Sequence, residues 1–272
     1  MSVQPSPAVQ RGVQLVKLLA AEPLTELSLS ELARRLGAHR SSCQTLLLAL
    51  CGEGLVTRVP RPGGPVYKLG PTLVELGEAA RASLGVLDLV DAALVRLRDR
   101  FGASALAGQV SGDAVVVVTA HPVPHPFGYT IATGTRLPLR APIGALYVAW
   151  ADGATVDAWC ERARPPLSRA RRDDVDEELA AIRARGWSAT VRSPDGAVRE
   201  AGPGDLRRPR TIIGISAPVW DEHGELTCSM ALAGFADPLD GPEVRRLAAA
   251  IAEEASAVTA AIGGRPPIRG LL

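Results

Sequence analysis

The chain has 272 residues, of which 47% are hydrophobic and 22% charged, and its formal net charge is +1 at pH 7. This length suits two domains, and the composition is that of a folded chain. No apolar run reaches the roughly 18 residues that a membrane span needs, and the first residues lack the pattern of a cleaved secretion signal, so we expect a cytoplasmic protein.

The small net charge hides an asymmetry between the two ends of the chain. Residues 1–70 carry eight Lys/Arg and four Glu, a net charge of +4, whereas residues 71–272 carry 22 basic and 25 acidic residues, a net charge of −3. The N-terminal end is therefore the end to inspect for polyanion contacts. The four cysteines show no C-x-x-C spacing, so we expect neither a disulfide nor a metal site.

Two short helices are predicted first. Residues 1–8 contain two prolines and are expected to form a disordered arm, and apolar residues at helical spacing then predict a helix over 9–21. Ser28 and Glu31 have the spacing of a capping box, which predicts the start of a second helix that Gly37 ends.

A third helix is predicted over 39–53. Its apolar face is formed at i, i+3, i+4 and i+7 by Cys43, Leu46, Leu47 and Leu50. The opposite side is mostly polar and carries Ser41, Gln44, Thr45 and Leu48. A short helix, a turn with glycine and such a second helix are typical of a helix-turn-helix, although structural helix pairs share the pattern.

A basic hairpin follows the third helix. Residues 55–59 and 65–69 are predicted to be two short strands joined by a Pro/Gly turn, with Arg58 and Arg61 near the tip. Together with the small polar residues of the helix, this wing suits contacts with base edges and phosphates.

Strands and helices are mixed in the rest of the chain. A linker helix is predicted over 71–85, and a further helix opens the second domain. Strands are predicted over 104–110, 114–120, 129–133, 187–192, 211–220 and 225–235. Helices are predicted over 141–151, 154–163, 173–185 and 242–262.

These residues resemble a known family. Residues 28–58, SLSELARRLGAHRSSCQTLLLALCGEGLVTR, and residues 67–77, YKLGPTLVELG, are similar to the winged helix-turn-helix of the IclR family of bacterial regulators. The resemblance continues, in the family's order, through GTRLPLRAPIGALYVAW, IRARGWS, APVWDEHGEL and ALAGF, and covers about residues 8–262.

The resemblance implies an α+β architecture. A winged helix-turn-helix over 1–70 and a linker helix over 71–85 would precede a GAF-like effector-binding domain over 86–264, in which helices flank an antiparallel sheet. We expect a disordered tail over 265–272.

The resemblance also implies which residues meet DNA, at the start of the third helix and in the wing. The expected DNA-binding residues are Ser28, Arg40, Ser41, Ser42, Gln44, Thr45, Arg58 and Arg61. Gln44 could pair bidentately with adenine. Thr45 stands where a long basic residue is common in the family, which indicates an unusual operator. A solvated loop tip is the alternative for the wing arginines, more so for Arg61.

Two groups of residues would line the effector pocket. The expected residues are Thr133, Gly134, Thr135, Pro142, Ile143 and Gly144 on one side and Gly214, Ala231 and Ala233 on the other. In family members that bind small keto acids the last three positions often carry Cys or Ser. Their apolar character here favours an apolar or aromatic carboxylate.

Residues 193–210 form a longer Gly/Pro-rich segment than the resemblance leads us to expect. The segment is either a lid over the pocket or a disordered surface loop. Arg207, Arg208 and Arg210 could reach an anionic ligand, although arginines in a loop are more often solvated.

Two other classes of protein compete with a regulator. An enzyme has little support, since no P-loop, nucleophile-elbow or H-E-x-x-H motif is present, and we expect no catalytic residues and no cofactor. His121 and His125 have a spacing that metal ligands can have, but the prolines between them forbid the helix that would align them. A sensory or scaffold dimer with a protein-binding winged helix is the other alternative.

The sequence therefore predicts a DNA-binding transcription regulator. Its expected partners are double-stranded operator DNA, a small-molecule effector and further copies of the chain in a homodimer or a dimer of dimers. The expected target is a catabolic operon.

Overall fold

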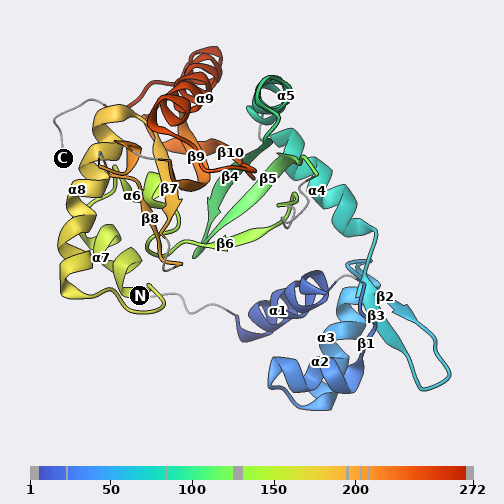
Figure 1. Cartoon of the computed structure of the whole chain (residues 1–272). Coiled ribbons are helices and arrows are strands. Elements are labelled where there is room, and N and C mark those ends of the chain that lie inside the picture. Colours follow the sequence, from blue (N-terminus) through green and yellow to red (C-terminus); the bar gives the residue numbers. More distant parts are fainter. Residues whose placement is uncertain are drawn as a thin grey trace. The chain divides into compact units, whose positions relative to one another are not determined.

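The structure is a computed structural model that describes residues 6–22, 24–83, 85–124, 131–193, 196–202, 204–207 and 209–267. The chain divides into two units, Met1–Leu84 and Gly85–Leu272, whose helices and strands are labelled in Figure 1. Each unit has a hydrophobic core of its own. Among the described residues, no helix combines the length and the apolar composition that crossing a membrane requires.

The first unit is a winged helix-turn-helix, as predicted. Its three strands form an antiparallel sheet in the order β1-β3-β2. The elements are α1 (Pro7–Ala21), β1 (Leu27–Ser28), α2 (Leu29–Leu36), α3 (Arg40–Gly52), β2 (Val56–Val59), β3 (Val66–Leu69) and α4 (Thr72–Ser83).

One apolar side of each helix builds the core of the first unit. Leu15 and Leu19 of α1 meet Leu32 of α2 and the buried pair Cys43 and Leu47 of α3. The spacing i, i+4 within α1 and α3 places these side chains on one helix face, which explains why the periodicity of the sequence located the helices.

Gly70 lets the chain after β3 touch the loop that follows α3. A Cβ at Gly70 would lie 1.9 Å from the carbonyl oxygen of Gly54, and the backbone N–H of Gly70 donates to the carbonyl of Leu55 at 2.9 Å. Only a residue without a side chain fits this contact, which joins the base of the wing to the end of α3.

The second unit is built on a seven-stranded antiparallel sheet in the order β6-β5-β4-β10-β9-β7-β8. Its strands are β4 (Ser104–Ser111), β5 (Ala114–His121), β6 (Arg136–Pro138), β7 (Ser188–Arg192), β8 (Val198–Glu200), β9 (Thr211–Trp220) and β10 (Leu226–Ala233). Its helices are α5 (Leu87–Phe101), α6 (Ala145–Val148), α7 (Gly153–Glu161), α8 (Arg169–Arg185), α9 (Gly241–Ala261) and the 3-10 turn η1 (Asp205–Arg207). The predicted α+β class is confirmed.

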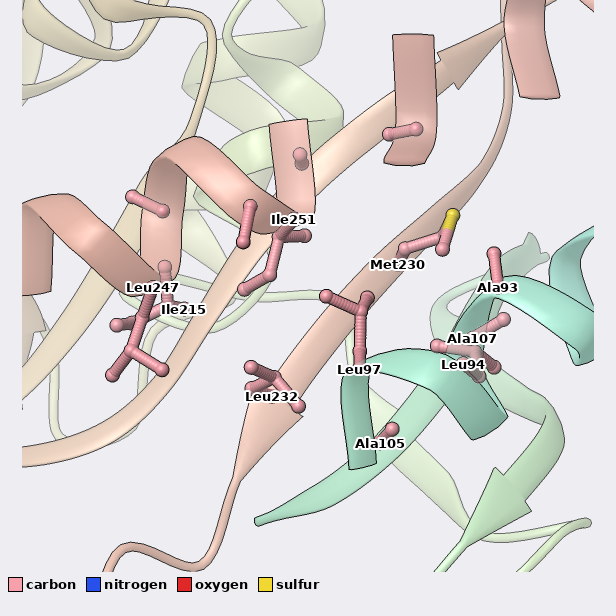
Figure 2. Close-up of a cluster of buried hydrophobic side chains, with 14 of the residues drawn as sticks. Ala93, Leu94, Leu97, Ala105, Ala107, Ile215, Met230, Leu232, Leu247 and Ile251 are labelled. Atoms are coloured by element: carbon pink, nitrogen blue, oxygen red, sulfur yellow. The ribbon is translucent and has the colours of Figure 1, made fainter. Parts of the chain in front are cut away.

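Helices α5 and α9 cover one face of this sheet (Figure 2). Leu94 and Leu97 of α5 and Ile251 of α9 pack against Met230 and Leu232 of β10. Small residues such as Ala105, Ala107 and Ala217 lie on the same face and let the helices approach the strands closely. The other face is left to the segment around α6, α7 and α8, which has a separate core.

The N-terminal prediction needs one correction. Helix α1 begins at Pro7, inside the expected arm, because proline suits the first turn of a helix, where its missing N–H is not needed. Residues 1–5 lie outside the described residues. The two-residue strand β1 was not predicted, since two residues show no periodicity.

Two predicted elements of the second domain are also wrong in position. The strand expected over 129–133 is absent from residues 131–133, and the strand that pairs with β5 is β6, a few residues later; residues 129 and 130 lie outside the described residues. The helix expected over 141–151 is reduced to α6, because Arg140 and Ile143 form an isolated bridge and Gly144 adopts a positive φ of 83°.

The expected disordered tail is ordered where the structure describes it. The backbone N–H of Arg265 donates to the carbonyl of Asp221 at 3.0 Å, and its Nε donates to the carbonyl of Glu222 at 3.1 Å. The prediction of disorder is therefore wrong for 265–267, while 268–272 lie outside the described residues.

Gly70→Ala is expected to destabilise the first unit by about 1–3 kcal/mol, because the new methyl group must displace the Gly54 carbonyl. Urea unfolding monitored by circular dichroism measures the change. Gly63→Ala in the wing turn is the matched control, since its Cβ would meet nothing within 4 Å. Equal stability of the two variants would contradict the close contact.

Candidate nucleic-acid interface and effector region

Helix α3 presents a mostly polar strip to solvent because the core of the first unit takes its apolar side. Cys43 and Leu47 are 0% and 1% exposed and pack against α1 and α2. The outward side chains, called the α3 strip below, are Ser41, Ser42, Gln44, Thr45 and Leu48. All four predicted DNA-binding residues between 41 and 45 are thus exposed on one helix.

Gln44 is the member of the α3 strip that suits a base edge. The Thr45 hydroxyl donates to the carbonyl of Ser41 at 3.1 Å, one turn back along the helix. Gln44 forms no hydrogen bond within the described part of the chain. An amide with a free donor and a free acceptor complements adenine in the major groove.

The start of α3 borders a basic hollow of about 450 Å³. Arg11, Arg34 and His39 are among its lining residues. His39 occupies the N-cap position of α3 without a side-chain hydrogen bond, so the first N–H groups of the helix have no side-chain acceptor there. Uncapped helix N–H groups beside cations favour a bound phosphate.

Arg40, at the first position of α3, donates to the Ser30 hydroxyl. Ser28 accepts the backbone N–H of Glu31 at 3.3 Å and so caps α2, as the capping pattern predicts. The reciprocal bond of a capping box is not formed among the described residues, because the Glu31 carboxylate pairs with Arg34 and Arg35 instead.

Acidic residues neutralise a particular subset of arginines in the first unit. Glu31 pairs with Arg34 and Arg35 at 2.5 and 2.7 Å, and Glu22 pairs with Arg35 at 2.6 Å. Hydrogen bonds from the two arginines lower the pKa of Glu31 to about 2. The arginines of α2 are therefore already engaged.

The two wing arginines, Arg58 and Arg61, differ in whether an acidic residue pairs with them. Arg61 donates from Nε to Glu26 at 2.9 Å, and Lys68 lies 3.2 Å from the same carboxylate. The Arg61 hydrogen bond, followed by that of Lys68, lowers the pKa of Glu26 to about 2. Arg58 is exposed and forms no ion pair within the part of the chain that the structure describes. Arg58 is therefore the freer of the two arginines.

In the second unit, the expected effector residues lie on the sheet face opposite α5 and α9. Ala231 and Ala233 alternate along β10 with core residues that face those helices, and Gly214 of β9 stands opposite Ala233. Ala231 and Ala233 belong to a small apolar cluster with Val117 and Ile131. The β-sheet thus brings this group to one surface.

The other predicted group meets the same surface along β5. Gly134 donates to the carbonyl of Val117 at 2.8 Å, and Val117 donates to the carbonyl of Thr135 at 2.9 Å, with Thr133 in the same turn. Gly144 lies against Val115, two residues earlier on β5. Pro142 and Ile143, which directly precede Gly144, complete the group. The carbonyl of Ile143 accepts the Trp159 indole N–H at 2.8 Å.

Sequence reasoning missed a polar pair on this surface. The Tyr147 and Ser229 hydroxyls lie 2.7 Å apart. Ser229 precedes Ala231 by two residues, so Ser229 and Ala231 lie on the same face of β10. Burial raises the pKa of Tyr147, which keeps this hydroxyl protonated. Alternation along β10 could have located Ser229, whereas nothing in the sequence indicated that Tyr147 reaches it.

Comparisons with known proteins agree with this architecture. The model of the IclR helix-turn-helix domain matches residues 8–60. The Escherichia coli (strain K12) regulator XynR is 24% identical over 262 residues, which cover 94% of this chain and 97% of XynR. Residues 8–60 therefore match an IclR helix-turn-helix domain, and the chain is similar over most of its length to a transcriptional regulator.

Solved IclR structures share the fold. An IclR transcriptional regulator from Alicyclobacillus acidocaldarius superposes with a TM-score of 0.74 at 24% identity, covering 96% of this chain and all of the other. An IclR homolog from Microbacterium hydrocarbonoxydans, complexed with 4-hydroxybenzoate, superposes with a TM-score of 0.66 at 17% identity, covering 92% and 99%.

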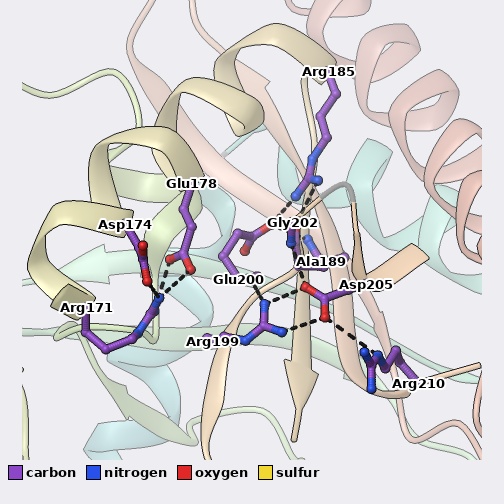
Figure 3. A network of polar contacts seen from close by, with 11 residues as sticks. Arg171, Asp174, Glu178, Arg185, Ala189, Arg199, Glu200, Gly202, Asp205 and Arg210 are labelled. Atoms are coloured by element: carbon purple, nitrogen blue, oxygen red, sulfur yellow. Dashed lines mark hydrogen bonds and ion pairs between the residues drawn. The ribbon is translucent and has the colours of Figure 1, made fainter. Parts of the chain in front are cut away.

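Residues 193–210 are not a disordered loop where the structure describes them. Strand β8 pairs with β7, and the carboxylate of Glu200 is buried at 2% exposure. This carboxylate pairs with Arg185 and accepts hydrogen bonds from the Ser188 hydroxyl at 2.6 Å and the Ala189 N–H at 2.8 Å (Figure 3).

A second buried carboxylate anchors the remainder of this segment. Asp205 pairs with Arg199 at 2.5 Å and lies 3.6 Å from Nε of Arg210 (Figure 3). Arg210 is thus directed at a carboxylate of the protein, while Arg207 is exposed and Arg208 lies outside the described residues. The segment forms an edge of the sheet.

His121 and His125 are the two histidines whose spacing metal ligands can have, although no metal site was expected there. Nε2 of His121 lies 2.9 Å from the carboxylate of Asp91, which also accepts the Thr119 hydroxyl at 2.7 Å. His125 lies outside the described residues. In the described ranges no cluster of three His, Cys, Asp or Glu side chains has the arrangement of a metal site.

Glu200 should make the stability of the chain depend on pH. Desolvation raises its pKa from 4.5 to about 7, against the opposing effect of Arg185. The folded chain therefore binds more protons than the unfolded chain between these pH values, so this group's contribution to the free energy of unfolding falls as pH rises from 4.5 to 7. A single titrating group changes the slope of the free energy of unfolding against pH by at most about 1.4 kcal/mol per pH unit.

Glu200→Gln should remove this part of the slope, which urea unfolding at a series of pH values measures. The exposed Glu177→Gln on α8 is the control and should leave the slope unchanged. Parallel pH profiles for the wild type and Glu200→Gln would contradict the assignment.

Proposed function

We propose that the chain binds a specific operator by inserting the α3 strip into the major groove of DNA. The observation that carries the proposal is the exposed Gln44 amide, which has no partner within the described residues and stands among small side chains that allow close approach. Bidentate amide contacts with adenine contribute about 1–3 kcal/mol of discrimination between bases.

The charges around the α3 strip also favour its insertion into the major groove. The acidic residues of the first unit engage Arg34, Arg35, Arg61 and Lys68, so the excess positive charge rests mainly on Arg11, Lys17, Arg40 and Arg58. Arg11 and Arg40 flank the start of α3, and Arg58 extends from the wing. Cations on both sides of a reading helix hold it in register through phosphate contacts.

The second unit supplies the effector site of the proposed regulator. Its surface opposite α5 and α9 combines apolar Ala231 and Ala233 with the hydroxyl pair Tyr147 and Ser229. One hydroxyl donates to the other, and the remaining proton is free for a ligand oxygen. Such a surface suits an apolar or aromatic carboxylate, the class to which the 4-hydroxybenzoate bound by the Microbacterium hydrocarbonoxydans homolog belongs.

Two copies of the chain would read the two half-sites of a pseudo-palindrome, in a homodimer or a dimer of dimers. Helix α4 leads from the first unit to the second in sequence, so effector binding would change the spacing of the reading helices through it. The proposed target is a catabolic operon, and the proposed activity requires no catalytic residue and no cofactor.

Replacing both Arg40 and Gln44 by alanine should abolish the sequence preference, because it removes a cation and the free amide next to the groove. The operator is first selected from random duplexes with the full chain, and fluorescence anisotropy then measures its affinity. We expect a loss of about 10- to 1,000-fold on the selected duplex and a smaller loss on unrelated DNA.

Gln14→Ala with Arg245→Ala is the matched control, since both residues are exposed and lie outside α3. Selection of no preferred duplex by the wild type would overturn the proposal and favour the scaffold dimer. Unchanged specificity of the Arg40 and Gln44 variant would show that another surface binds the DNA.

Tyr147→Phe tests the effector site. The variant loses the hydroxyl that lies beside Ser229, so we expect it to bind 4-hydroxybenzoate about tenfold more weakly by isothermal titration calorimetry. By reciprocal linkage, 4-hydroxybenzoate should also bind the wild type differently when operator is present.

Tyr67→Phe in the core of the first unit is the control and should bind the ligand as the wild type does. Identical ligand affinity with and without operator would contradict the coupling. Identical affinity of the wild type and Tyr147→Phe would contradict the assigned site.

A further inference from the structure

A second cavity, separate from the proposed effector surface, opens between α8, α9 and the end of β9. Its volume is about 310 Å³, at the lower end of the roughly 300–1,000 Å³ of small-molecule sites. Ala217 of β9 and Ala252 of α9 are part of its lining. Ala217 belongs to the core under α5 and α9, whereas Trp150 packs against the core around α6, α7 and α8, so the cavity is lined from both sides of the sheet. None of its lining residues belongs to the proposed effector surface around Ala231 and Tyr147.

Aromatic and proline side chains form much of the cavity wall. Trp150 and Trp220 meet edge to face, with ring centroids 4.8 Å apart and an angle of 84° between the ring planes. Neither indole N–H forms a hydrogen bond within the described part of the chain, so both can donate to a ligand. Flat rings next to prolines suit a planar, apolar molecule.

The C-terminal segment is held in place as part of this wall. The N–H of Gly264 donates to the carbonyl of Thr259 at 2.8 Å, and a Cβ at Gly264 would lie 1.9 Å from the carbonyl oxygen of Trp220. Glycine at this position therefore allows the chain to pass directly over β9. The next residues, anchored through Arg265, bring Pro266 and Pro267 to the cavity.

One charge and two hydroxyls make up the polar part of the lining. Nη1 of Arg183 donates to the carbonyl of Ala149 at 2.6 Å, which holds the guanidinium in position, and Arg183 forms no ion pair among the described residues. The Thr259 hydroxyl accepts the backbone N–H of Trp220 at 3.1 Å, so its own proton remains available, and the Ser256 hydroxyl lies one turn away on α9. Among the residues that the structure describes, no acidic side chain lines the cavity.

The geometry points to a second ligand site that binds an aromatic monocarboxylate. The carboxylate would pair with the Arg183 guanidinium and accept hydrogen bonds from the Thr259 and Ser256 hydroxyls, and the ring would lie against Trp150 and Trp220. A guanidinium without an acidic partner, beside donors and flat apolar walls, matches the two ends of such a molecule. This site is independent of the proposed operator and effector functions.

Calorimetric titration of the full chain with benzoate, and with its neutral analogue benzamide, tests the site. We expect benzoate to bind at least about tenfold more tightly than benzamide, because only benzoate pairs with the guanidinium. Arg183→Gln should weaken benzoate binding about tenfold or more and leave benzamide unchanged, whereas Ser256→Trp, which fills the cavity, should abolish the binding of both. Arg245→Gln on α9, an exposed arginine outside the cavity, should bind as the wild type does.

Benzoate could also enter the proposed effector surface, so the titrations are repeated with Ala231→Leu, which fills that surface. Binding that survives Ala231→Leu and is lost in Arg183→Gln and Ser256→Trp supports the second site. Binding that is lost in Ala231→Leu and unchanged in both cavity variants would overturn it, while leaving the effector proposal intact. The absence of any benzoate binding at millimolar concentrations would overturn it as well.

Discussion

The burial of Cys43 and Leu47 determines what the first unit can do. These two side chains lie one turn apart on α3 and fill the space between α1 and α2, so the helix cannot rotate without exposing them. The opposite side of the helix must then face solvent, and it happens to carry short polar side chains and Gln44. The proposed base-reading surface is therefore a consequence of core packing, and a mutation that loosens the core would also misdirect the α3 strip.

In the second unit, burial of one face of the sheet likewise determines which residues lie on the other face. Alternate residues of β10 point to opposite faces, so the burial of Met230 and Leu232 under α5 and α9 obliges Ala231 and Ala233 to face the other way. This second face gathers the turn around Gly134 with the approach to α6. The proposed small-molecule site and a rigid core can coexist because the two sets of side chains never compete for one position.

Periodicity explains which parts of the structure the sequence could predict. The core-facing residues of α3 and α9 recur at helical spacing, and those of β9 and β10 alternate, so each element and its buried side could be located. The family resemblance added the order of the segments and the fold they form. Elements of two or three residues, such as β1 and β6, are too short to show a period, and their pairing partners decide where they form.

Long-range electrostatic pairing explains what the sequence could not show. Residues 193–210 are rich in glycine, proline and arginine, a composition that suits a loop, yet Arg185 lies on another element and draws Glu200 into the protein. Glu26 likewise engages Arg61 from a distant position, which separates it from Arg58 although both stand in the same wing. The sequence alone does not indicate which distant residue will form an ion pair with a given charged side chain. In these two cases a tertiary contact, rather than local propensity, decides the structure.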